Sequence, residues 1–257
     1  MDAEILRQIA DNTQPKKSMS ILVSGNETKL STRFNPPLQL DPKKKYEIAL
    51  INLETYHSIP NVDATNNYFR YSPDNQVTWF DIHLPVGSYD IVDLHQTLVQ
   101  KMKANGHYDD ANEQAKITIS ANTSTLKSLL VIAENFAVDF RENTSLNSVL
   151  GFNNQVYESG SHDSEQVVNI MQINSVFVKT DVIGGSYVNG QTRNVIYNFY
   201  PDVSPGYKIL QNPNNLVYLP VILDTISSVV VELTDQNFKQ LNLRGENLTI
   251  RFHLREA

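Results

Sequence analysis

The segment from Gly184 to Pro220 constrains the fold more than any other part of this chain. It reads GGSYVNGQTRNVIYNFYPDVSPGYKILQNPNNLVYLP, so short apolar or aromatic pieces alternate with Gly, Pro and Asn. Gly184-Gly185 and Asn189-Gly190 supply positions that tolerate a positive φ, which tight hairpin turns require. Pro201 and Pro205-Gly206 interrupt any helical path. The spacing of these residues leaves no room for a helix of ordinary length.

Extended pieces fill the spaces between these turn residues. VIYNFY, residues 195–200, is rich in β-branched and aromatic residues, which predicts a strand. Ile209-Leu210 and Val217–Leu219 are two more extended pieces, with a turn at residues 212–215 between them. We expect the whole segment to be a long crossing that takes the chain from one sheet of an all-β sandwich to the other.

The rest of the chain continues the β pattern, with about ten strands in all. LTIRFHL, residues 248–254, alternates strictly between apolar and polar side chains, whereas YEIALINLETY, residues 46–56, does not. The second pattern predicts a β-bulge or burial on both faces. Val167–Val178 is predicted to be a long apolar strand, with a split at Asn174 as the alternative. One long helix is predicted over residues 90–104, where it should cover an edge or end of the sandwich. Asp90 is its expected N-cap, and its apolar face consists of Ile91, Leu94, Leu98 and Met102.

Two parts of unequal size are expected. Residues 1–17 should form an N-terminal arm, because a short amphipathic helix that ends at Pro15 is too short to be stable alone. Residues 18–257 should form a single domain, because no Gly, Ser or charged linker divides them. No gap between predicted strands is long enough for a second domain or a tower-like insertion. The predicted fold class is all-β, a single jelly-roll β-sandwich with one helix of about 15 residues.

Composition excludes several classes of function. The chain has 257 residues, no Cys and a formal net charge of −7, so it offers no disulfide, no thiol chemistry and no broad basic field for nucleic acid. Two basic runs, Lys16-Lys17 and Lys43–Lys45, are interpreted as solvated turns, so no specific nucleic acid is expected as a partner. The N-terminus lacks the pattern of a secretory signal, and no apolar run approaches a membrane span. We expect the protein in the cytosol, the nucleus or a particle assembled there.

The sequence offers little chemistry. None of the six histidines forms a His-x-His or His-x3-His pair, and no Gly-x-Ser-x-Gly or phosphate-binding glycine loop occurs. His162-Asp163 has no third partner nearby in the sequence. Paired carboxylates that meet only in the folded chain remain open. We therefore expect no enzyme activity, no catalytic residue, no metal and no cofactor.

Aromatic residues are concentrated in the segment from Gly184 to Pro220. They are Tyr187, Tyr197, Phe199, Tyr200, Tyr207 and Tyr218. Three interpretations are open: stacking on a sugar, as in a lectin-like module; anchoring a subunit contact, where Tyr is enriched; or burial as core beneath long loops. Core and interface together are favoured, because the prolines indicate rigid connections. The candidate subunit interface consists of Tyr187, Tyr197, Tyr200, Tyr207 and Tyr218.

Several short motifs of this chain, from about residue 18 to the end, resemble one protein family in their order and spacing. They are Tyr46–Leu50 (YEIAL), Leu84–Ile91 (LPVGSYDI), Gly185–Gly190 (GSYVNG), Ile196–Pro201 (IYNFYP), Pro205–Lys208 (PGYK), Tyr218–Pro220 (YLP), Asp235-Gln236, Arg244–Glu246 and Ile250–Arg255 (IRFHLR). In these motifs the chain is similar to the minor capsid, or penton, proteins of Polinton (Maverick) elements and adintovirus-like viruses.

The resemblance implies a single jelly roll that forms a homopentamer at the fivefold vertices of an icosahedral shell. Its neighbours would be trimers of a double-jelly-roll major capsid protein. The protein would be found in the virion, after assembly in the host cytoplasm or nucleus. The resemblance implies no catalytic residue and no cofactor. The alternative function is a lectin-like carbohydrate-binding jelly-roll module.

Overall fold

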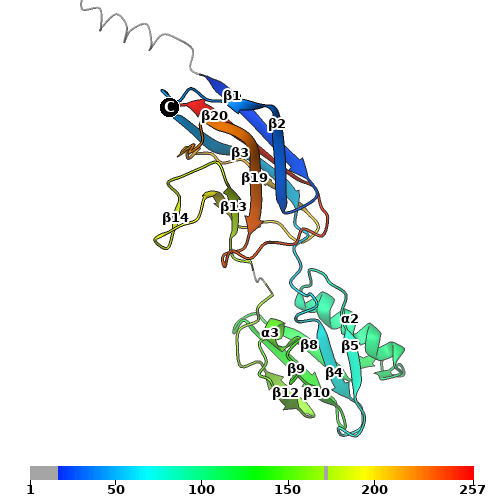
Figure 1. The fold of residues 1–257 in the computed structure, drawn as a ribbon. Coiled ribbons are helices and arrows are strands. Elements are labelled where there is room, and N and C mark those ends of the chain that lie inside the picture. The colour runs from blue at the N-terminus through cyan, green and yellow to red at the C-terminus, as the bar shows by residue number, and fades with distance from the viewer. Residues whose placement is uncertain (1–16, 171–172) are drawn as a thin grey trace, which may run out of the picture. The chain divides into compact units, whose positions relative to one another are not determined.

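The computed structural model describes residues 17–170 and 173–257, and the chain divides into two compact units. One unit combines the chain up to residue 57 with residues 173–257, and we call it the jelly-roll unit. The other, residues 58–172, is the inserted unit (Figure 1). This division differs from the single domain over 18–257, without an insertion, that the sequence pattern predicts. The expected arm at residues 1–17 lies outside the described residues except for Lys17.

Two antiparallel sheets build the jelly-roll unit. The first has the order β1-β20-β3-β17, with β18 pairing β3 beside β17; the second has the order β16-β13-β19-β2. The strands of the first sheet are β1 (Ser18–Gly25), β20 (Leu248–Glu256), β3 (Tyr46–Tyr56), β17 (Lys208–Gln211) and β18 (Leu219–Pro220). Those of the second are β16 (Val195–Phe199), β13 (Val176–Thr180), β19 (Thr225–Thr234) and β2 (Lys29–Gln39).

The strand order identifies the fold. With β18 and the small hairpin at residues 187–192 set aside, the first sheet contains the first, eighth, third and sixth strands of this unit, and the second contains the fifth, fourth, seventh and second. Strands that follow one another along the chain therefore mostly lie in different sheets, which is the wrapping of a jelly roll. The predicted all-β jelly-roll class is confirmed. The inserted unit occupies the connection between the third strand, β3, and the fourth, β13.

The irregularity predicted for residues 46–56 is also confirmed. Strand β3 pairs with β20 along its length, but the register shifts between Arg251 and Phe252, which lie opposite Asn52 and Leu50. Ile51 is therefore the extra residue of a bulge. Strand β20 has the strict alternation expected of it, with its four apolar side chains buried between the sheets: Leu248, Ile250, Phe252 and Leu254.

The inserted unit has its own hydrophobic core, whose buried members all lie between Val62 and Tyr157. One sheet has the order β11-β10-β4-β5, a second has the order β12-β9-β8, and β6 and β7 form a small hairpin. Its strands are β4 (Tyr68–Ser72), β5 (Phe80–His83), β6 (Tyr108–Asp109), β7 (Gln114–Ala115), β8 (Ile117–Asn122), β9 (Lys127–Ile132), β10 (Ala137–Asp139), β11 (Val156–Tyr157) and β12 (Gly160–Asp163).

The predicted helix exists, but it belongs to this inserted core. Helix α2 (Ile91–Ala104) begins at the N-cap Asp90, whose carboxylate accepts a hydrogen bond from Asp93 N at 2.7 Å. Its four predicted apolar side chains are buried in the core of the inserted unit. The expectation that it covers the sandwich is therefore wrong. A second helix, α3 (Asn147–Leu150), is a single turn. Among the described residues, no helix is long and apolar enough to span a membrane.

The run Val167–Val178 explains why the sequence pattern conceals the boundary. Val168 and Ile170 pack against the core of the inserted unit, and Val168 N donates a hydrogen bond to Leu126 O at 2.9 Å. Val176 and Val178 are buried in β13 of the jelly-roll unit. The run is thus not one continuous strand: it is split before β13, as the alternative allowed, and its two parts supply two separate cores.

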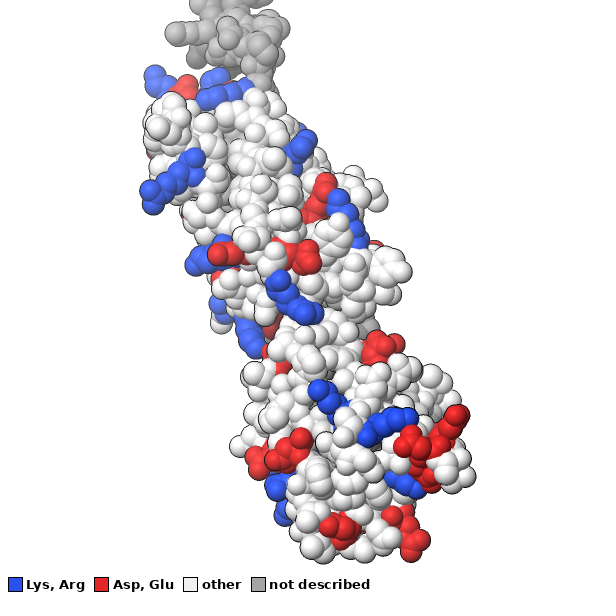
Figure 2. All heavy atoms as spheres, turned by 90° about the vertical axis from the view of Figure 1, so that its right-hand side faces the viewer, with Lys and Arg blue, Asp and Glu red and all other residues white. Residues whose placement is uncertain are grey.

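The two units also differ in charge. Residues 58–172 contain fourteen acidic and six basic residues, so the inserted unit carries a formal net charge of −8. The remainder of the chain carries +1 by the same count. In the lower part of Figure 2, the visible face of the inserted unit carries several groups of acidic side chains, with basic side chains between them. The net negative charge of the chain therefore lies entirely in the insertion.

A pair of core substitutions tests the division into two units. Leu98→Ala removes a fully buried side chain of α2 and should destabilise the inserted unit by about 2–5 kcal/mol. Ile250→Ala should have the same effect on the jelly-roll unit. Hydrogen exchange should show lost protection within residues 58–172 for the first variant and outside them for the second. Loss of protection in both units with either variant would contradict the division.

The stability of the inserted unit should depend on pH through His95. Burial lowers the pKa of His95 below its ordinary value of 6.5, and its Nδ1 accepts a hydrogen bond from Ile119 N at 3.3 Å. The unfolded chain therefore takes up this proton first as the pH falls. The free energy of unfolding should decrease as the pH drops below 6.5. His95→Asn should weaken that decrease in denaturant titrations, and an unchanged pH dependence would assign it to other groups.

Candidate functional site

The segment 184–220 lies along one edge of the jelly roll and begins with a hairpin. Strands β14 (Tyr187–Val188) and β15 (Gln191–Thr192) pair with Val188 opposite Gln191, so only two residues form the turn. These residues, Asn189 and Gly190, have φ values of 50° and 78°. A two-residue hairpin turn with both φ values positive is the type that Asn-Gly favours. The turn expected from the sequence is therefore confirmed.

After the hairpin, the chain crosses between the sheets as predicted. Strand β16 is the edge of the second sheet, whereas β17 and β18 pair with β3 in the first. The crossing between β16 and β17 is fixed by His57, whose N donates to Tyr207 O and whose O accepts from Gly206 N, both at 2.8 Å. The Nδ1 atom of His57 is also 2.6 Å from Val203 O. The proline-rich connection is thus held by backbone hydrogen bonds.

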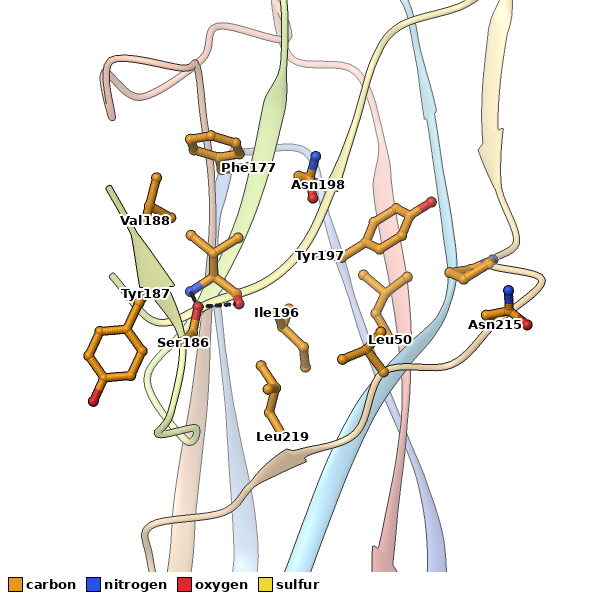
Figure 3. Close-up of a pocket in the computed structure, with 13 residues that line it drawn as sticks. Leu50, Phe177, Ser186, Tyr187, Val188, Ile196, Tyr197, Asn198, Asn215 and Leu219 are labelled. Carbon is orange, nitrogen blue, oxygen red and sulfur yellow. Dashed lines mark hydrogen bonds between the residues drawn. The ribbon is translucent and has the colours of Figure 1, made fainter. Parts of the chain in front are cut away.

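A pocket of about 470 Å³ opens at this edge (Figure 3). Its lining consists of Leu50, Phe177, Ser186, Tyr187, Val188, Val195, Ile196, Tyr197, Asn198, Pro213, Asn215, Val217 and Leu219. Apart from Leu50 and Phe177, all of these belong to the segment 184–220. None of the lining side chains is charged. The sequence did not indicate Leu50 or Phe177, because their positions depend on strand pairing with distant residues.

Two polar side chains of the pocket, Ser186 and Tyr197, form hydrogen bonds within the protein. The Ser186 hydroxyl donates to Val195 O at 2.7 Å and accepts from Val195 N at 3.1 Å. The Tyr197 hydroxyl, on β16, donates to Gln211 Oε1 on β17 at 3.2 Å, which links the two sheets. Burial raises the pKa of the Tyr197 phenol. An uncharged pocket of this kind suits an apolar or amide-bearing protein surface.

The five tyrosines of the candidate interface divide into two groups. Tyr187, Tyr200 and Tyr207 are exposed, at 68%, 45% and 68%. Tyr197 and Tyr218 are half-buried and hydrogen-bonded within the subunit. The pocket lining includes Tyr187 and Tyr197 but not the other three. Their participation in a subunit contact stays a prediction.

Exposed apolar side chains accompany these tyrosines. Half of the large apolar residues that are exposed in the described part of the chain lie within residues 187–223: Tyr187, Tyr200, Tyr207, Leu210, Leu216, Val217, Ile222 and Leu223. We call these eight residues, together with the pocket, the edge surface. Concentrations of exposed apolar groups are typical of protein contact sites. The edge surface is therefore the candidate functional site.

Three of the motifs that carry the family resemblance meet beside this surface. The Tyr218 hydroxyl is 2.7 Å from His253 Nδ1, and the guanidinium of Arg255 lies 3.6 Å from the centre of the Tyr218 ring. Arg255 also pairs with Glu47 at 2.6 Å. The other ring nitrogen of His253 is 2.6 Å from the Ser18 hydroxyl. These contacts join β1, β3, β20 and the residue directly before β18, so this part of the motif set stabilises the fold.

The described residues contain no group of three or more His, Asp or Glu side chains that could hold a metal ion. His162, which the sequence placed beside Asp163, instead lies with Nε2 2.8 Å from Glu158 O. Its ring packs edge-on against Tyr157, with 5.3 Å between centroids. Both contacts are structural ones within the inserted unit.

The contact between Tyr218 and His253 can be tested by a minimal substitution. Tyr218→Phe keeps the ring beneath Arg255 but removes the hydroxyl, and should lower the free energy of unfolding by about 1 kcal/mol. Tyr187→Phe is the matched control, because an exposed substitution should stay within about 0.5 kcal/mol of the parent. Equal stability of the two variants in denaturant titrations would show that the hydrogen bond contributes nothing measurable.

No protein-family model and no curated protein matches this chain. Among solved structures, a similar one is the crystal structure of the selenomethionine-labelled penton protein of mavirus. The comparison covers 95% of this chain and 100% of that chain, with 11% sequence identity and a TM-score of 0.49. No residue role is transferred from that protein.

Proposed function

We propose that this chain is the penton subunit of an icosahedral capsid, a minor capsid protein that forms a homopentamer at the fivefold vertices. The edge surface is the observation that carries the proposal. Four of the motifs that resemble the penton proteins of Polinton elements and adintovirus-like viruses lie at one edge of the jelly roll, in the segment 184–220. Half of the exposed large apolar residues of the described chain lie within residues 187–223. Jelly rolls are a recurrent fold of viral capsid subunits.

A fivefold ring requires two different faces on each subunit, because each copy contacts its neighbours head to tail. The edge surface supplies one such face, with exposed tyrosine rings on short, proline-stiffened connections. Tyr207 is well suited to be an anchor, since its backbone is fixed by His57 while 68% of the residue is exposed. An anchor that is already rigid loses little conformational entropy on binding.

Charge influences how stable such a ring can be. Five copies at −7 each would carry −35, but that charge lies in the inserted units, while the jelly-roll units are close to neutral. A ring closed through the jelly-roll units therefore avoids most of the repulsion at the contact itself. We expect a weak pentamer that moderate salt stabilises, because salt screens the acidic insertions from one another.

The surrounding shell would provide the remaining contacts. In the proposed setting, the neighbours are trimers of a double-jelly-roll major capsid protein, and the assembled protein is found in the virion. Before assembly, the protein would be in the host cytoplasm or nucleus. The proposal includes no enzyme activity and no cofactor.

The ring is tested by removing two exposed anchors one at a time. Tyr207→Ala and Tyr187→Ala should each cost about 2 kcal/mol or more per contact, which weakens association about 30-fold. Leu126→Ala is the matched control, because it removes an exposed apolar side chain of the inserted unit. Sedimentation velocity over a range of protein and salt concentrations should show a ring for the parent and the control, and a monomer for both tyrosine variants.

Other outcomes of this experiment are equally informative. If the parent stays monomeric at every concentration and is absent from purified particles, the penton proposal fails. Binding of the monomer to a glycan array would then support the lectin-like module. If the ring forms but both tyrosine variants keep it, the pentamer stands and the contact lies elsewhere on the jelly roll.

A further inference from the structure

Two basic runs that are distant in the sequence meet at one end of the jelly-roll unit. The backbone carbonyl of Lys17 accepts a hydrogen bond from Glu256 N, and that of Lys45 accepts one from Ala257 N, both at 2.9 Å. The start of β1, the end of β20 and the turn before β3 therefore lie side by side. Four lysines are exposed there, and we call them the basic end: Lys17, Lys43, Lys44 and Lys45. At the top of the described part in Figure 2, Lys and Arg side chains lie close together, with an acidic side chain among them.

Two carboxylates, Asp41 and Glu256, lie close to the basic end and offset half of the charge of its four lysines. Asp41 accepts a hydrogen bond from Lys43 N at 3.0 Å, so it stabilises the turn. Glu256 pairs with Lys44 at 3.0 Å and raises the pKa of that ammonium group. Within the described part of the chain, Lys43 and Lys45 have no ion-pair partner. The end of the sandwich thus retains a net positive charge.

Lys17 also keeps its charge available. Its Nζ atom donates to Gln39 O at 2.9 Å, which is a neutral acceptor. In the sequence, Lys16 directly precedes it. The hydrogen bond holds the ammonium group beside the turn at residues 41–45, which concentrates positive charge on a small surface.

The basic end lies far from the point where the chain leaves for the acidic insertion. Strand β3 begins at Tyr46, next to the lysines, and ends at Tyr56, immediately before the inserted unit. Eleven residues of strand span roughly 35 Å. Charge is therefore distributed unevenly along the jelly-roll unit. Its lysine cluster lies at the end opposite the connection to the inserted unit, which has a net charge of −8.

We propose that the basic end binds the phosphate backbone of nucleic acid without reading its sequence. Lysines on flexible side chains neutralise phosphates as point charges, whereas base recognition favours planar bidentate groups such as Arg and Asn. Within the described residues the basic end offers little to a membrane surface, because interfacial binding also needs apolar side chains that insert. Among the described residues, none of the exposed large apolar side chains lies within residues 39–47 or 253–257.

The biological setting of this binding rests on the proposed function. In a ring with fivefold symmetry, all five basic ends point the same way along the axis, so twenty lysines would face one side. That side would then be turned toward the packaged genome. Each contact would be weak, but five linked contacts on one polymer bind far more tightly than one.

Binding is measured most directly by fluorescence anisotropy with the full chain and labelled DNA duplexes of about 30 base pairs in two unrelated sequences. Both duplexes should bind equally. With three or four phosphates neutralised, affinity should fall roughly 50- to 150-fold between about 50 and 200 mM salt. The triple variant Lys43→Gln, Lys44→Gln, Lys45→Gln should reduce the slope of log affinity against log salt by about 3.

A matched control distinguishes binding at the basic end from a nonspecific effect of the protein's total positive charge. The variant Lys29→Gln, Arg33→Gln, Lys239→Gln removes the same charge from exposed positions elsewhere on the jelly-roll unit and should retain the parent affinity. Equal loss in both triple variants would overturn the proposal. So would absence of duplex binding at about 50 mM salt, or binding to phosphatidylserine vesicles in place of DNA.

The same protein variants distinguish failure of this inference from failure of the proposed function. Sedimentation of the parent and of the basic-end variant shows whether each forms the ring. If the parent forms no ring at any concentration and is absent from purified particles, but DNA binding is lost in the basic-end variant, the binding site stands and the penton proposal fails. If the ring forms and DNA does not bind, the proposed function stands and the basic end is only a solvated turn.

Discussion

Strand β3 and its pairing with β20 organise the jelly-roll unit. On its other side, β3 receives β17 near Tyr56 and β18 near Tyr46, so the segment 184–220 is attached to both ends of the same strand. The turn that carries Lys43–Lys45 comes directly before β3, and the inserted unit begins directly after it. The buried face of β20 supplies a continuous apolar row against the second sheet, which secures the pairing by burial as well as by hydrogen bonds. A register slip of one residue would turn that row toward solvent.

Local signals in the sequence were sufficient for the elements that depend on near neighbours. The bounds of β3, the bulge within it, the alternation of β20, the cap and apolar face of α2, and the Asn189-Gly190 turn all follow from spacing over a few residues. The jelly-roll class follows in turn from the proline-rich crossing. The division into two units could not be predicted in this way, because the insertion is itself rich in strands. One apolar run, residues 167–178, also supplies both cores.

The candidate site, too, could be predicted only in part from the sequence. Tyrosine enrichment marks the edge surface in the sequence, but only the fold separates Tyr187, Tyr200 and Tyr207, which are exposed, from Tyr197 and Tyr218, which bond within the subunit. Leu50 and Phe177 join the pocket through long-range pairing. The two lysine runs, each an ordinary solvated turn in sequence, become one cluster because β1, β20 and the turn before β3 meet. Strand topology thus decides which charged and apolar side chains lie together on the surface.

The proposed function requires a subunit whose edge surface closes a ring of five. Native mass spectrometry of the purified chain at moderate ionic strength tests that claim most directly, because it counts subunits without assuming a shape. The chain has a mass of 29.1 kDa, so the account predicts a dominant species of five times that mass, and a shift toward single subunits as the protein is diluted. A mass of 29.1 kDa at every concentration, or a closed assembly of any other number of copies, would contradict it.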